Sequence, residues 1–325
     1  MRRDLLSIVE AGYGAHSAPE WERRVIDAAQ PLERGLGVCL HRMEWDGDAF
    51  RHGDVVGRDA RVSEWLLRNS QNFTTAFPEV ARRGFRIENS GKTNSQLSRM
   101  RWLRRLRIPP LTPLEPSAPM RDVIGVLGVI DPAAVVMLYV PCPAITEIEP
   151  RQVRRLRMVG VHLGAGRRLI ENDGAIEAVL DAGGRVLHAE GAARLARQEI
   201  RRRAVAIDRA RTRVGRADID RALSVWRGLV AGRWSLVERF ESDGRRLMVA
   251  RKNPPRLART LALTTTEQRV VELLVHAENQ KWVAYTLGLS PAAVSLLVEH
   301  ASVKLGVRSI GELVAVVRAL APKLR

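Results

Sequence analysis

The chain has 325 residues, of which 46% are hydrophobic and 27% are charged. These proportions are ordinary for globular proteins and exclude wholesale disorder, and a usual domain size of about 100–200 residues predicts two or three domains. The 53 lysines and arginines outnumber the 36 acidic residues, which gives a net charge of +17 and a pI near 11.2. Such a charge attracts polyanions, most often nucleic acid, although a coding bias toward arginine explains it equally well.

Cysteine content and hydropathy indicate the compartment. Two cysteines, Cys39 and Cys142, are too few for a disulfide scaffold in a chain of this length. The first residues lack the apolar run of a signal peptide, and the longest apolar runs, 123–130 and 133–140, are far shorter than the ~20 residues that span a bilayer. We therefore expect a soluble, cytoplasmic protein without membrane contact.

Residues 1–172 contain both helical and strand patterns. Apolar residues spaced three or four apart predict four helices, at 5–9, 21–29, 62–67 and 150–170. Alternating or continuously apolar runs that end at turn residues predict three strands, at 37–45, 121–130 and 134–140. This pattern favours an antiparallel sheet with flanking helices.

Charge, proline and glycine mark three further features of this part. Segment 82–107 has nine basic residues and one acid, and it predicts either a solvated helix face or a surface that holds DNA backbone. Segment 108–120 contains five of the 16 prolines and is predicted to be a surface loop. Gly125 and Gly128 in a strand, and Gly164 and Gly166 in a helical pattern, are interpreted as packing glycines, because neither pair begins a nucleotide-binding loop.

Residues 173–252 show two hairpins around a helical middle. The expected strands of the hairpins lie at 176–180, 185–189, 234–240 and 245–251. The middle, 194–216, has nine arginines against two acids. Asn253-Pro254-Pro255 then predicts a linker at 253–262.

The last residues, 263–325, show only helical signals. Gly288 separates two apolar-periodic segments and predicts a tight corner with positive φ. Three helix starts carry an N-cap Ser or Thr followed by Pro, or by Glu three residues later: Thr264 with Glu267, Ser290 with Pro291, and Ser309 with Glu312.

Residues 263–308 resemble the LuxR-type (GerE-like) helix-turn-helix and align with it without a gap. The matching residues are Leu263, Thr264, Glu267, Val270, Leu273, Leu274, Lys281, Val283, Ala284, Leu287, Gly288, Leu289, Ser290, Val294, Lys304, Leu305, Gly306 and Val307. A generic helical bundle explains the apolar positions but not the joint occurrence of Ala284, Gly288, Ser290 and the Lys-Leu-Gly-Val ending. The resemblance implies an all-α DNA-binding domain of a transcriptional regulator.

The resemblance also implies that the helix beginning at Ser290 enters the major groove. The candidate DNA-binding residues are Lys281, Ser290, Ala292, Ala293, Ser295, Leu296, Glu299, His300 and Lys304. Lys281 and the backbone N–H groups at the helix start are expected to bind phosphates. Glu299 is expected to accept from a cytosine amino group, and Leu296 to meet a thymine methyl.

This helix departs from the family pattern in its charge. Ser295, Leu297 and Glu299 stand where the family usually has lysine, histidine and a polar or basic residue. Residues 263–325 contain seven basic and five acidic residues, so most of the positive charge lies in the preceding parts. The alternative is therefore a degenerate regulator whose helix-turn-helix binds protein and does not read DNA sequence.

The preceding parts resemble sensor domains. Residues 1–172 are similar to a GAF-like domain, and residues 173–252 to a small PAS-like domain. The expected fold is an α/β sensor region followed by an all-α helix-turn-helix domain. Together they imply a one-component regulator that acts as a homodimer on double-stranded DNA, with an unidentified small-molecule effector and RNA polymerase as further partners. Dimerisation and spacer modules without a ligand are the alternative.

No constellation of residues indicates catalysis. Cys39 and His41 share a strand face that Cys142 can join, but Cys-X-His lacks the spacing of a zinc site. A buried cysteine beside a hydrogen-bonded histidine explains them better. We expect no enzymatic activity, no cofactor and no metal. Trp282 stands where the family often has an exposed residue and is interpreted as part of an interface.

Overall fold

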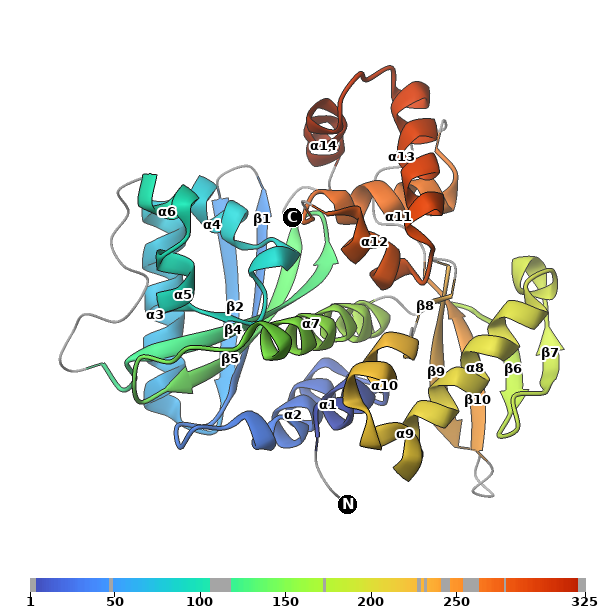
Figure 1. The fold of residues 1–325 in the computed structure, drawn as a ribbon, viewed down its shortest axis with the longest axis horizontal. Coiled ribbons are helices and arrows are strands. Elements are labelled where there is room, and N and C mark those ends of the chain that lie inside the picture. Colours follow the sequence, from blue (N-terminus) through green and yellow to red (C-terminus); the bar gives the residue numbers. More distant parts are fainter. Residues whose placement is uncertain are drawn as a thin grey trace.

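The structure, a computed structural model, describes residues 4–46, 49–105, 118–171, 174–226, 229–230, 233–240, 246–253, 263–277 and 279–320 (Figure 1). Two antiparallel sheets, each with its own helices, are followed by a helical C-terminal part. This coarse architecture agrees with the fold class expected from the sequence. Residues 108–117 of the proline-rich segment and 254–262 of the expected linker lie outside the described residues.

Five antiparallel strands form the first sheet, in the order β2-β1-β5-β4-β3. Their bounds are β1 Cys39–Asp46, β2 Ala49–Gly57, β3 Lys92–Thr93, β4 Asp122–Asp131 and β5 Ala134–Cys142. The three predicted strands are confirmed and occupy the centre, whereas β2 and β3 were missed by the sequence pattern. β2 is an edge strand without a buried residue, so it lacks the apolar alternation that identifies a half-buried strand.

Helices cover both faces of this sheet. Their bounds are α1 Leu5–Tyr13, α2 Ala18–Ala28, α3 Ala60–Ala76, α4 Pro78–Gly84, α5 Asn94–Ser98, α6 Arg101–Arg105 and α7 Pro150–Glu171, with short 3-10 turns at Gln30–Leu32 and Ile87–Asn89. Successive strand residues point to opposite faces. Accordingly Cys39 of β1 packs with Val62 and Leu66 of α3, whereas Leu40 joins the core that α1 and α7 cover.

Glycines let α7 approach β4 closely. A Cβ atom on Gly164 would lie 2.3 Å from the carbonyl oxygen of Val129. A Cβ atom on Gly128 would lie 2.6 Å from the amide nitrogen of Gly164. Neither distance is possible for carbon, so the close contact between helix and strand requires glycine at both positions. Their interpretation as packing glycines is confirmed.

The second sheet is also antiparallel, in the order β7-β6-β10-β9-β8. Its strands are β6 Ile176–Asp181, β7 Val186–Ala189, β8 Leu229–Val230, β9 Trp234–Phe240 and β10 Arg246–Lys252, and its helical middle holds the 3-10 turn Gly191–Arg194, α8 Arg197–Arg211, α9 Arg213–Ala217 and α10 Ile219–Val225. Both predicted hairpins are confirmed. When each sheet is numbered from its own first strand, the two share the order 2-1-5-4-3.

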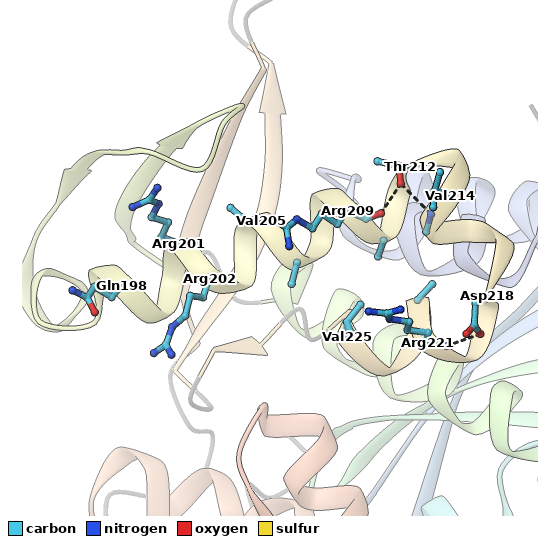
Figure 2. A pocket seen from close by; sticks show the side chains of 14 residues that line it. Gln198, Arg201, Arg202, Val205, Arg209, Thr212, Val214, Asp218, Arg221 and Val225 are labelled. Carbon is cyan, nitrogen blue, oxygen red and sulfur yellow. Dashed lines mark hydrogen bonds between the residues drawn. The ribbon is translucent and has the colours of Figure 1, made fainter.

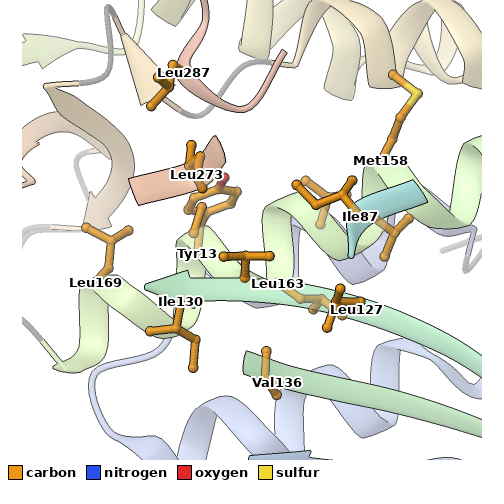
Figure 3. Packing of buried hydrophobic residues seen from close by; sticks show 14 of the residues in the cluster. Tyr13, Ile87, Leu127, Ile130, Val136, Met158, Leu163, Leu169, Leu273 and Leu287 are labelled. Carbon is orange, nitrogen blue, oxygen red and sulfur yellow. The ribbon is translucent and has the colours of Figure 1, made fainter. Parts of the chain in front are cut away.

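Four helices form the C-terminal part, namely α11 Thr265–Leu274, α12 Gln280–Leu287, α13 Pro291–Leu305 and α14 Ile310–Ala319. Helix α11 is enclosed, and every residue from Glu267 to Leu274 is buried. One cluster of buried apolar residues runs from Leu6 to Val317 through all three parts of the chain. Figure 3 shows members of this cluster, among them Tyr13 of α1 and Leu273 of α11.

The predicted helix starts are present, with one difference. Thr264 takes part in a full capping box, and Ser290 caps α13. Ser309 caps α14 by accepting from the backbone N–H of Glu312 at 3.2 Å. The Glu312 carboxylate, however, accepts from the backbone N–H of Arg308 at 2.7 Å instead of from Ser309. The second predicted capping box is therefore replaced by a bond one residue upstream.

No single helix in the described part of the chain is long and apolar enough to cross a membrane; α12 and α13 meet those criteria only as a pair, across a bend of 105°.

Candidate nucleic-acid interface

Helices α12 and α13 meet at a tight corner. Three residues separate them, and the chain direction turns by 105°. Gly288 adopts the left-handed conformation with φ of +68°, and the Leu289 N–H donates to the Ala284 carbonyl at 2.9 Å. The Ser290 hydroxyl then accepts from the Ala293 N–H at 3.1 Å, which starts α13. An angle of about 90–120° across a short glycine-containing turn is helix-turn-helix geometry.

The inner sides of both helices are packed as the sequence predicts. In α12 the buried residues include Val283, Ala284 and Leu287. In α13 they are Val294, Val298 and Ala301, which recur at helical spacing and form one apolar face. The remaining face of α13 points away from the sheets.

The candidate DNA contacts mostly lie on accessible surface. Only Ala293 is half-buried, and the exposed residues are Lys281, Ser290, Ala292, Ser295, Leu296, Glu299, His300 and Lys304. Several of these polar groups already have partners. The Ser290 hydroxyl caps α13, and the Ser295 hydroxyl donates to Oε1 of Gln280 at 2.8 Å. Lys281 lies in the first turn of α12 and not on α13.

Lys304 is held by Glu267. Its ammonium donates to both carboxylate oxygens of Glu267, at 2.9 and 2.8 Å. The same carboxylate accepts from the backbone N–H of Thr264 at 2.7 Å. Burial acts to raise the pKa of Glu267, but Lys304 and the Thr264 N–H outweigh it, and the pKa is lowered. Lys304 therefore fastens the end of α13 to the start of α11, and it is the only cation in the sequence of α13.

The exposed side of α13 also carries apolar residues. Leu296 is 51% exposed and Val303 76% exposed, and Ile310 at the start of α14 is 49% exposed. Trp282 and Leu297, by contrast, pack against the core. An exposed apolar strip beside Glu299 gives this face little attraction for phosphate.

A basic cluster adjoins the other end of the C-terminal part. Desolvation and the nearby guanidinium groups of Arg86 and Arg82 lower the pKa of Arg318. Arg318 belongs to α14, whereas Arg82 and Arg86 belong to the arginine-rich segment 82–107. Like charges gathered in this way create a positive potential that favours a polyanion.

A chain of buried and partly buried hydrogen bonds joins α12 to the preceding parts. The Tyr13 hydroxyl of α1 lies 2.9 Å from Nδ1 of His162 in α7, and Nε2 of His162 lies 3.0 Å from the Tyr285 hydroxyl of α12. Tyr285 donates its proton to the carbonyl oxygen of Leu223 in α10 at 2.6 Å. His162 must therefore donate from Nε2 and accept from Tyr13 at Nδ1.

The charge state of His162 agrees with this order. Burial lowers the pKa of His162 from 6.5 to about 3, so the ring is neutral near pH 7 and has a single N–H. The Tyr13 and Tyr285 hydroxyls, the His162 ring and the Leu223 carbonyl then each have a hydrogen-bond partner. These hydrogen bonds link α1, α7, α10 and α12, and so connect both sheet-containing parts to the corner between α12 and α13.

His276 forms a second junction, at the end of α11. Its Nδ1 lies 3.1 Å from the carbonyl oxygen of Phe85, and its Nε2 lies 2.9 Å from that of Asp131. Its own carbonyl accepts from the Ile87 N–H at 2.8 Å. Burial lowers the pKa of His276, although the carbonyl oxygens act to raise it. The junction fastens α11 to the first sheet and to the segment after α4.

Two further contacts hold α12 and its turn. The Arg157 guanidinium of α7 lies 4.8 Å from the ring centre of Trp282, so Trp282 contacts the first part of the chain. The Arg203 guanidinium of α8 donates to the Gly288 carbonyl at 3.2 Å. The first helix of the corner is thus docked on the sheet-containing parts, while Leu296, Glu299 and Val303 on the outer face of α13 stay exposed among the described residues.

Sequence reasoning missed His162, Tyr285 and Arg203. Each sits in a helical pattern without a local signal, and its partner lies 62 to 149 residues away along the chain. No family model matches the sequence, and no curated protein matches it either. The resemblance of residues 263–308 to a LuxR-type helix-turn-helix therefore stays a prediction from their sequence.

Proposed function

We propose that the protein is a DNA-binding transcriptional regulator in which α13 reads the major groove. The observation that carries this proposal is the corner between α12 and α13, with its 105° turn, left-handed Gly288 and exposed outer face. A second helix presented in this way fits the major groove. The LuxR-type motif residues at 263–308 support the same function.

The two sheet-containing parts are proposed to be GAF-like and PAS-like sensor domains. In support, the first has leading helices, a central antiparallel sheet and the closing helix α7, and the second has an opening hairpin, a helical middle and a closing hairpin. We further propose that the regulator acts as a homodimer on double-stranded DNA and contacts RNA polymerase. The docking of α12 on both parts provides a route from sensor to reader.

A protein-interaction function is the second candidate. It is favoured by the exposed apolar residues Leu296 and Val303, and by a face whose one cation, Lys304, is paired with Glu267. A helix that binds nucleic acid normally offers cations to phosphates, whereas an apolar strip bordered by polar residues suits a protein partner.

Selection from random double-stranded DNA separates the two candidates. If α13 reads bases, the full chain recovers a sequence motif, and Glu299→Ala changes the preferred bases with a discrimination change of about 1–3 kcal/mol for the lost contact. Ser224→Ala, at an exposed serine of α10, serves as the control and leaves the motif unchanged. A folded wild-type chain that recovers no motif overturns DNA reading and leaves the protein-interaction function.

A further inference from the structure

A groove of about 920 Å³ lies between α8 and α10 (Figure 2). Its walls are helical and include Arg202, Val205 and Arg209 of α8 and Arg221 and Val225 of α10. The wall residues of α8 are three and four positions apart, and the two wall residues of α10 are four positions apart. Each helix therefore presents one face to the groove. The volume is within the range of about 300–1,000 Å³ that is usual for small-molecule sites.

The rim of the groove is strongly basic. Arg201, Arg202, Arg209 and Arg221 line it, are exposed, and make no ion pair within the part of the chain that the structure describes. One carboxylate, Asp218, also lines it, but that group accepts from the Arg221 backbone N–H at 3.1 Å as the cap of α10. The rim thus carries a local excess of positive charge.

Two neighbouring arginines, Arg211 and Arg216, form ion pairs. Arg211 pairs with Glu10 and Glu238, and Arg216 pairs with Asp4 and Glu10. These paired arginines fasten α8 and α9 to α1 and to the second sheet. Within the arginine-rich segment 194–216, Arg211 and Arg216 are therefore paired and stabilise the fold, whereas Arg201, Arg202 and Arg209 line the groove.

The floor of the groove is apolar and built from small residues. It includes Ala206 and the buried Ala210 and Ala222. A nucleic-acid backbone is recognised by cations and hydrogen-bond donors, and an apolar floor adds nothing to that recognition. Guanidinium groups over an apolar floor match a small molecule that combines phosphate, sulfonate or carboxylate with an aromatic or aliphatic body.

Both helices that form the groove also contact the corner between α12 and α13. Arg203 of α8 follows the rim residue Arg202 and donates to the Gly288 carbonyl at 3.2 Å. Leu223 of α10 follows the floor residue Ala222 and accepts from the Tyr285 hydroxyl at 2.6 Å. A ligand that changes the spacing of α8 and α10 therefore changes the two contacts that position the corner.

We propose that this groove is an effector site for a small amphipathic organic anion, and that its occupancy is transmitted to the corner through Arg203 and Leu223. The binding step is independent of the proposed DNA-reading function, and the regulatory meaning of the transmission rests on that function. Both steps are measured below without DNA, so their outcome does not depend on whether the protein reads DNA.

Anilinonaphthalene sulfonate, an aromatic anion whose fluorescence rises in apolar sites, is the probe for binding to the full chain. In the Arg202→Gln/Arg209→Gln variant, the Kd for the probe is expected to rise about tenfold or more, because charge-assisted hydrogen bonds are lost. The matched Arg197→Gln/Arg213→Gln variant removes the same charge from exposed residues outside the groove and is expected to change the Kd by about twofold or less. Equal effects of the two variants overturn the site.

Two further measurements test the apolar floor. Ala206→Phe fills the groove without changing its charge and is expected to block the probe, whereas unchanged binding contradicts the proposal. The neutral analogue N-phenylnaphthylamine supplies only the apolar body of the proposed ligand, and inorganic pyrophosphate supplies only the anionic group. Each is expected to compete poorly with the probe. Full competition by pyrophosphate reduces the site to a phosphate contact and overturns the amphipathic ligand class.

Amide hydrogen exchange tests the transmission. The saturating probe is expected to change the exchange rates of residues 285–290 in the full chain. Arg203→Gln leaves the groove lining intact, so it is expected to preserve probe binding and to reduce that change. Bound probe with unaltered exchange at the corner refutes the transmission, and a reduced probe affinity in Arg203→Gln refutes the separation of binding from transmission.

Discussion

Each hydrogen-bond donor in the chain from Tyr13 to Leu223 has one acceptor. Tyr13 donates to His162, His162 donates to Tyr285, and Tyr285 donates to the Leu223 carbonyl. A buried polar group without a partner costs about 1–3 kcal/mol, so this order stabilises only the arrangement in which α12 is docked. A protonated His162 would turn an N–H toward Tyr13 and leave the Tyr13 proton without its acceptor.

The buried histidine makes stability depend on pH. The pKa of His162 is 6.5 when the chain is unfolded and about 3 in the folded protein. Between these values the unfolded chain binds a proton that the folded chain does not, so the free energy of unfolding falls as pH falls below 6.5. His162→Gln keeps an acceptor and a donor, and is expected to reduce this fall by up to about 1.4 kcal/mol per pH unit.

Urea unfolding at pH 7.5, 6 and 5 measures this dependence. His188 is exposed on β7, so His188→Gln serves as the control and is expected to keep the wild-type slope. A His162→Gln slope equal to that of the wild type would show that the ring already binds a proton in the folded protein.

Among the elements, the corner between α12 and α13 depends on a single backbone conformation. Gly288 has φ of +68°, a region where a residue with a Cβ atom is disfavoured by about 1–2 kcal/mol. The helix caps on either side, Gly288 itself and Ser290, fix where α12 ends and α13 begins. The exposed face of α13 is thus set by two residues that need not touch DNA themselves.

Gly288→Ala is therefore expected to lower the free energy of unfolding of the full chain by about 1–2 kcal/mol. Gly311→Ala is the matched control, because Gly311 lies in the first turn of α14 with no positive φ and only Ser309 near its missing Cβ. That substitution is expected to be neutral or stabilising by up to about 1 kcal/mol. Equal losses in chemical denaturation would rule out the left-handed backbone as the cause.

Elements with strong local patterns could be predicted, and elements without them could not. The apolar runs of β4 and β5, the spacing of α7 and the turn at Gly288 all arise from neighbouring residues, and all were predicted. The edge strand β2 has no buried residue, so periodicity cannot identify it. At the candidate site, the exposed face of α13 followed from its helical spacing, but the pairing of Lys304 with Glu267 joins residues from two helices and required the structure.

At the scale of the whole molecule, the three parts share one core rather than meeting at small surfaces. The buried cluster is continuous from α1 to α14, and α11 is enclosed by it. Motions of the C-terminal part relative to the sheets must therefore break buried contacts. Tyr285 is the residue on which those contacts converge, because its hydroxyl bonds to both α7 and α10.

Tyr285→Phe removes that hydroxyl and keeps the ring. It is expected to lower the free energy of unfolding by about 1–3 kcal/mol, because His162 and the Leu223 carbonyl lose a partner, and to speed amide exchange across α12. Tyr139→Phe is the control, since Tyr139 lies on β5 within the first part and burial raises the pKa of its hydroxyl. It is expected to cost a similar free energy without speeding exchange in α12. Faster exchange there in both variants would contradict a specific role for Tyr285.

The distribution of charge over the molecule leads to a final prediction about DNA. The face of α13 has one cation, which is paired, whereas Arg82 and Arg86 of the first part lie beside Arg318 of α14. If these arginines contact phosphates, the logarithm of the binding constant for double-stranded DNA falls with the logarithm of salt concentration by about 0.9 for each phosphate neutralised. Arg82→Gln/Arg86→Gln is then expected to reduce this slope by up to about 1.8.

The control variant is Arg197→Gln/Arg213→Gln, which removes equal charge from exposed residues of α8 and α9. It is expected to leave the salt dependence of DNA binding nearly unchanged. Equal slopes for the wild type and both variants would mean that segment 82–107 is a solvated surface that DNA does not touch.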